Sequence, residues 1–171
     1  ASVCPSGALT YAYPRVPDAG ARLKTLLSTY REAGGQYACI LFHDAEHGRT
    51  AVLALGRRGR GLPARVIPVE CHHVASVGID TLLGAICYGA SQVLVVATDE
   101  VAAGYSQALR EQMRLANTVL DALGYAGRRC ELIDAASLEQ SLWRQSPAAK
   151  AAAAAVFNLS PEKRTSLDFE L

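Results

Sequence analysis

Long apolar runs, an excess of charge of one sign and a regular set of cysteines are all missing from this sequence of 171 residues. No apolar run approaches the roughly 20 residues that a helix needs to cross a bilayer, so the sequence predicts no membrane span. The formal net charge is +1 and no basic stripe with interleaved aromatic residues is present, so nucleic acid is not an expected partner. What remains, 50% hydrophobic and 19% charged residues, is typical of a globular domain with a buried core.

The five cysteines are odd in number and widely spaced, which does not indicate a disulfide framework. A reducing cytoplasm is therefore the expected location. Cys39, Cys87 and Cys130 fall within predicted strands or helices, and we interpret them as small apolar residues of the core. Cys4 and Cys71 stand in different surroundings, and each suggests a function.

Cys4 is followed directly by Pro5 and a turn of small residues. This pair resembles the last ligand in the run C-x2-C-x2-C-x3-C-P of bacterial ferredoxins, which wraps a 4Fe–4S cluster. The three preceding cysteines of that run are not in the sequence. We therefore expect residues 1–17 to be the end of a ferredoxin-type module and a linker, with Cys4 a 4Fe–4S ligand in a longer, intact protein.

From residue 37 onward, short apolar runs alternate with longer amphipathic stretches. This alternation is typical of repeated strand–helix units and a parallel sheet. Residues 18–145 are therefore predicted to form an α/β domain: an open, mainly parallel four-stranded sheet with helices on both faces, a flavodoxin-like three-layer sandwich. The predicted strands are 37–42, 65–69, 92–97 and 129–133, and the predicted helices are about 21–33, 46–57, 77–88 and 102–123.

The last segment, residues 146–171, is predicted to hold a helix over Pro147–Phe157, because this stretch is rich in alanine. From Ser160 onward we expect a loose tail that leads to a removed segment.

All four histidines of the chain fall where the predicted strands end. Ligands of open parallel sheets bind beyond the carboxyl ends of the strands, so these residues are expected at one edge. Imidazole, thiolate and carboxylate groups are the ligands of zinc or iron. The sequence thus predicts a single-metal or small-ligand site there, with an ordinary polar sheet edge as the other interpretation. The candidate ligands are His43, His47, Cys71, His72, His73 and Asp99.

Other chemistry has less support in the sequence. His43-x-x-Glu46-His47 matches an inverted zinc-peptidase pattern, but it falls on a predicted turn where that pattern needs a continuous helix. The glycine patterns of dinucleotide and nucleotide-triphosphate sites do not follow the first strand, although flavin binding does not require them. Arg57-Arg58-Gly59-Arg60 with Arg65 forms a basic loop suited to an acidic partner or a phosphate.

Three segments resemble a known family. They are Val66–Cys71, Gly78-Ile79-Asp80 and the run Gly89–Ala97, and they are similar to the iron–sulfur delta subunit of methyl-viologen-reducing hydrogenases. The resemblance implies a domain that holds a two-iron cluster and passes electrons between a hydrogenase and a flavin-containing reductase. Where that family has its other cysteines, this chain has His43, Asp44 and His47 and, after the third strand, Thr98-Asp99-Glu100.

Only Cys71 matches the ligand set of that family, and one thiolate does not hold a two-iron cluster. We therefore predict a domain without its own cluster, which serves as an accessory part of a multi-cluster, ferredoxin-type electron-transfer protein. Its expected partners are the flanking ferredoxin modules of the same chain and a redox protein that docks on it. The alternatives are the single-metal site and a flavin-binding electron carrier.

Overall fold

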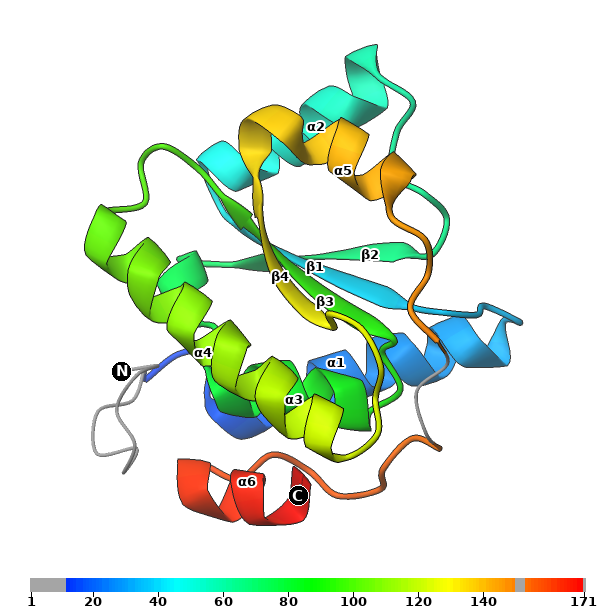
Figure 1. Ribbon diagram of the computed structural model, residues 1–171, viewed down its shortest axis with the longest axis vertical. Coiled ribbons are helices and arrows are strands. Elements are labelled where there is room, and N and C mark those ends of the chain that lie inside the picture. Colours follow the sequence, from blue (N-terminus) through cyan, green and yellow to red (C-terminus); the bar gives the residue numbers. More distant parts are fainter. Residues whose placement is uncertain (1–11, 150–152, 171) are drawn as a thin grey trace.

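A computed structural model describes residues 12–149 and 153–170 (Figure 1). Its strands are β1 (Cys39–Asp44), β2 (Val66–Cys71), β3 (Gln92–Ala97) and β4 (Cys130–Asp134). Its α-helices are α1 (Val16–Glu32), α2 (His47–Arg58), α3 (Ile79–Cys87), α4 (Ala103–Ala122), α5 (Leu138–Arg144) and α6 (Lys163–Glu170). Short 3₁₀ turns follow β2 at Val74–Ser76 and β4 at Ala135–Ser137. Cys4 and the ferredoxin-type turn predicted around it lie outside the described residues.

The four strands form one sheet in the order β2-β1-β3-β4, and all neighbouring strands are parallel. This confirms the predicted open α/β sandwich, whose strand order is that of a flavodoxin-like, doubly wound sheet. The order reverses between β1 and β3, and Asp44 is the last residue of β1 at that point. In such sheets this reversal is where ligands usually bind.

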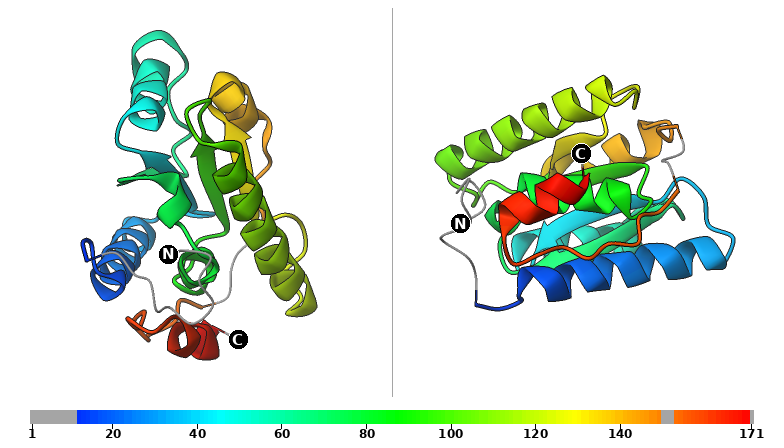
Figure 2. Two further views of the ribbon diagram at one scale, coloured as in Figure 1. Left: turned by 90° about the vertical axis from the view of Figure 1, so that its left-hand side faces the viewer. Right: turned by 90° about the horizontal axis from the view of Figure 1, so that it is seen from below.

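Helices cover both faces of the sheet (Figure 2). Alternate strand residues belong to two separate cores, one on each face. Ile40, Phe42, Val93 and Val95 face the larger core, which α1, α3 and α4 close. The neighbouring residues in sequence, such as Leu41 and Leu94, face a smaller core against α2 and α5. Because β1 and β3 are buried on both faces, their runs Cys39–Phe42 and Val93–Ala97 are continuously apolar, as expected for central parallel strands.

The C-terminal segment differs from the prediction. Residues 147–149 and 153–157 are not helical, so the predicted Pro147–Phe157 helix is wrong there. The chain from 154 to 160 instead runs extended across α1 and α3, because Lys24 Nζ bonds the carbonyl oxygens of Val156 and Phe157 and the Ala155 amide donates to Cys87 O. These tertiary contacts override the helix propensity of alanine.

The predicted loose tail from Ser160 is wrong as well. This stretch contains α6, which lies on the outer side of α3 (Figures 1 and 2). We call residues 154–170 the C-terminal strap. Leu159 of the strap is buried and its amide donates to the Tyr88 hydroxyl at 3.0 Å, so the strap belongs to the folded domain.

Candidate functional site

The predicted site residues follow the carboxyl ends of β1, β2 and β3, as the sequence indicates. His43 and Cys71 lie at the ends of neighbouring strands, and the Cys71 thiol donates to the His43 carbonyl oxygen at 3.3 Å. The His43 ring is buried, with 6% of the residue exposed, and its Nδ1 donates to the Asp44 carbonyl oxygen at 2.9 Å. The structure therefore brings His43 and Cys71 together, but through the backbone.

The side chain of Asp44, the last residue of β1, lies at the N-terminal end of α2. Its carboxylate accepts from the Glu46 amide at 2.9 Å and from the Gly48 amide at 3.1 Å. A Cβ on Gly48 would lie 2.8 Å from Asp44 Oδ2, so only glycine leaves room for this contact. Helix N-termini bind anions through such free amides. Since the Asp44 carboxylate already holds these amides, this helix end does not favour a phosphate, including that of a flavin nucleotide.

The Cys71 side chain is kept as a neutral thiol. Burial, followed by the negative charge of Asp44, raises its pKa from 9.0 to about 12. Metals bind the thiolate rather than the thiol. A metal that binds Cys71 therefore has to displace a firmly held proton.

The remaining predicted ligands are directed elsewhere. The His73 Nδ1 accepts from the Ala75 amide at 3.0 Å, and its ring contacts Tyr105 edge-on with centroids 5.6 Å apart. His47, His72 and Asp99 are exposed on separate loops or helix ends. Within 12–149 and 153–170, no three His, Cys, Asp or Glu side chains are grouped so as to hold a metal ion. The metal site stays a prediction from the sequence.

A different group of residues gathers at the far end of α2. Arg57, Arg58 and Arg60 are exposed, and in the described part of the chain none of them forms an ion pair. The Arg60 guanidinium lies over the ring of Trp143 from α5, 4.0 Å from its centroid. The Trp143 indole N–H donates to Gly61 O at 3.0 Å and the residue remains 38% exposed. We call Arg57, Arg58, Arg60 and Trp143 the arginine–tryptophan patch.

The loop after α2, which contributes Arg60 to this patch, is held in place by α5. The Arg60 amide donates to a carboxylate oxygen of Glu139 at 2.5 Å, and a Cβ on Gly59 would collide with the same carboxylate. Arg65, predicted as part of the basic loop, turns inward to Gln92 Oε1 and Gln145 O instead. Trp143 and Glu139 were not predicted, because no sequence pattern indicated α5. A lone tryptophan followed by arginine was the available signal.

Comparison with known proteins adds no relative. No protein-family model matches this chain, and no curated protein matches it. The sheet order therefore defines the class, an open, doubly wound α/β domain, and any function is argued from its surfaces. Among the described residues, no helix is both long and apolar enough to span a membrane.

Proposed function

We propose that this chain is an accessory docking domain of a multi-cluster, ferredoxin-type electron-transfer protein, and that the arginine–tryptophan patch binds an acidic surface of the redox partner. The observation that carries the proposal is the patch itself: three exposed arginines, whose guanidinium groups form no ion pair with the described residues, and an exposed tryptophan. Arginine and tryptophan are the residues most enriched at protein–protein interfaces and their energetic centres.

The patch is built to keep its shape. Trp143 is fixed by its hydrogen bond to Gly61 O, and the Arg60 guanidinium is fixed by stacking on the ring. A side chain that is ordered before binding loses less entropy when the partner arrives. Arg57 and Arg58, in the last turn of α2, add two further positive charges shortly before Arg60 in the sequence.

A small acidic electron carrier fits these properties. Redox proteins form short-lived complexes with small interfaces, and complementary charges on the two proteins speed their association. Under this proposal, electrons pass through the ferredoxin modules of the intact chain, to which Cys4 would belong.

The test is a binding titration of the 171-residue chain against a purified two-cluster bacterial ferredoxin with an acidic surface, at several salt concentrations. We expect binding that weakens steeply with salt, because exposed charges are screened. Replacing Arg57→Glu and Arg58→Glu together should weaken binding at low salt by about tenfold or more.

The matched control is Arg22→Glu with Arg110→Glu, which changes the charge equally on α1 and α4. This pair should retain most of the affinity. Equal losses in the two double variants would mean that only net charge matters and would overturn the assignment of the patch. Failure of the unmodified chain to bind would overturn it too.

A further inference from the structure

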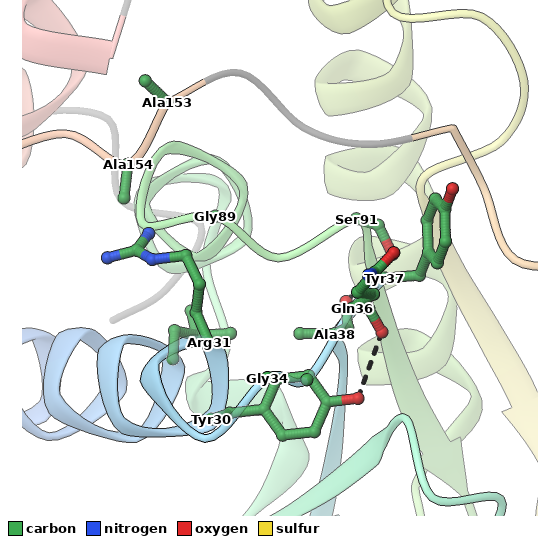
Figure 3. A pocket seen from close by; sticks show the side chains of 12 residues that line it. Tyr30, Arg31, Gly34, Gln36, Tyr37, Ala38, Gly89, Ser91, Ala153 and Ala154 are labelled. Carbon is green, nitrogen blue, oxygen red and sulfur yellow. Dashed lines mark hydrogen bonds between the residues drawn. The ribbon is translucent and has the colours of Figure 1, made fainter.

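A pocket of about 760 Å³ lies at the opposite edge of the sheet from the strand ends that the sequence singled out. It opens between the carboxyl end of α1, the turn at Gly89 that follows α3, and Ala153-Ala154, where the strap begins (Figure 3). Ala38 and Ser91, which precede β1 and β3, form its inner wall. Its volume is within the range of small-molecule sites.

Glycines keep this space open. Gly34 and Gly89 have φ values of 87° and 103°, a backbone region that other residues rarely adopt, so side chains are not expected to fill the pocket from these positions. Gly35 lies directly against the Tyr30 ring, where any Cβ would overlap it. The Tyr30 hydroxyl donates to Gln36 O at 3.1 Å, so the ring is a fixed part of the wall (Figure 3).

Among the described residues that line the pocket, Arg31 is the one that carries a charge. It is exposed, and within the described residues it has no ion pair. Its side chain extends along the mouth toward Ala154 (Figure 3), and its Nη1 lies 3.5 Å from the position of a Cβ on Gly89. An unpaired guanidinium at the mouth favours an anionic group on the ligand.

We infer that this pocket binds a small planar anion, whose flat apolar body lies in the pocket beside Tyr30 and whose negative group pairs with Arg31. The wall supplies an aromatic face and small apolar side chains, and the mouth supplies one positive charge. This site is separate from the arginine–tryptophan patch, and its existence does not depend on the docking function.

The experiment uses 8-anilinonaphthalene-1-sulfonate, a planar aromatic sulfonate whose fluorescence rises in apolar surroundings, with the 171-residue chain at neutral pH. We expect saturable binding of one molecule per chain. Arg31→Gln should weaken it at least tenfold, Arg31→Lys should weaken it less, and Ala154→Phe should abolish it by filling the pocket. Arg22→Gln, also exposed on α1 but outside the pocket, should bind as the unmodified chain does.

Each variant is first compared with the unmodified chain by thermal melting, since the dye also binds partly unfolded proteins that expose hydrophobic surface. Arg31 is exposed, so its substitutions are expected to leave the fold intact. If Ala154→Phe melts early, Ala153→Phe at the neighbouring exposed position replaces it. Absence of saturable binding, or equal binding by Arg31→Gln and Arg22→Gln, would overturn the inference.

Discussion

Glu170, the last residue of α6, buries its carboxyl group against α3, and neither of its oxygens is hydrogen-bonded to a described residue. Burial, followed by the negative charge of Asp80, raises its pKa from 4.5 to about 9, and Lys163 opposes this only in part. Lys163 itself is buried, and its Nζ lies 3.6 Å from Asp80 Oδ1. At neutral pH the Glu170 side chain is therefore a neutral acid within the strap.

This predicts how stability depends on pH. The folded pKa is above the unfolded one, so the contribution of Glu170 is complete below about pH 4.5 and is lost as the pH rises toward 9. Glu170→Gln removes the ionisation and should stabilise the domain by about 1.4 kcal/mol for each pH unit above 4.5, so by several kcal/mol at pH 8 and by less than about 1 kcal/mol at pH 5.

Urea unfolding of both proteins at pH 5, 7 and 8 measures this difference. Asp168→Asn, an exposed position on the same helix, is the control and should show no such trend. A Glu170→Gln effect that is equal at all three pH values would contradict the buried, protonated state.

Asp44 has a structural role that its position at the strand end did not indicate. Asp44→Ala leaves the Glu46 and Gly48 amides without their partner and should cost about 1–2 kcal/mol of unfolding free energy, the range for loss of a helix cap. Asp99→Ala, at the exposed end of β3, should change stability by less than about 0.5 kcal/mol. Denaturant titrations compare the two, and similar values would show that Asp44 does not hold α2.

Residue types and spacing placed His43 and Cys71 at one edge, and the structure agrees. The burial and the hydrogen-bond partners of these two side chains could not be predicted from the sequence, because they depend on backbone groups that folding brings close to them. The Cys71 thiol, for example, faces the carbonyl of His43, 28 residues away in sequence. The same holds for Arg65, whose partners Gln92 and Gln145 come from elements far along the chain.

At the level of elements, the strands were predicted well because each is a short apolar run between turns, and α2, α3 and α4 followed from their periodicity. Helix α1 begins at Val16 rather than near Ala21. Pro17 stands in its first turn, where proline is tolerated, so the expected linker is partly helix. The strap was missed because its conformation depends on contacts with Lys24, Cys87 and Tyr88 rather than on its own composition.

The strap fits the body of the domain at two helical glycines. A Cβ on Gly20 of α1 would lie 2.9 Å from the Leu159 Cβ, and one on Gly84 of α3 would lie 3.0 Å from the Leu159 side chain. Alanine is normally the better helix former by about 1 kcal/mol. At Gly20 that gain is opposed by displacement of a buried leucine.

We therefore predict that Gly20→Ala destabilises the domain, by about 1–3 kcal/mol, despite the higher helix propensity of alanine. Gly56→Ala in α2, where a Cβ would meet nothing within 4 Å, should instead stabilise it by about 0.5–1 kcal/mol. Opposite signs in thermal melting distinguish close packing of the strap from a general effect of glycine. If Gly20→Ala also stabilises the domain, Leu159 of the strap does not pack closely against α1 at Gly20.

For the whole molecule, the sheet and its two helical layers follow from hydrophobic pattern and from the handedness of strand–helix–strand connections. The two surfaces proposed as binding sites do not follow from these patterns. The arginine–tryptophan patch joins α2 to α5, and the pocket joins residues 27–38 to Gly89, Ser91 and Ala153-Ala154. Both depend on segments that meet only in the folded chain, so the sequence showed the arginines of the patch but neither its tryptophan nor the pocket.

NMR would show directly whether the arginine–tryptophan patch docks an acidic redox protein, as we propose. Adding an acidic two-cluster ferredoxin to the ¹⁵N-labelled 171-residue chain should perturb backbone signals of residues 57–61 and 139–144 and the indole N–H of Trp143. Signals near His43, Cys71 and Asp99 should stay unchanged. Perturbations centred on those strand ends, or none at millimolar ferredoxin, would contradict the account.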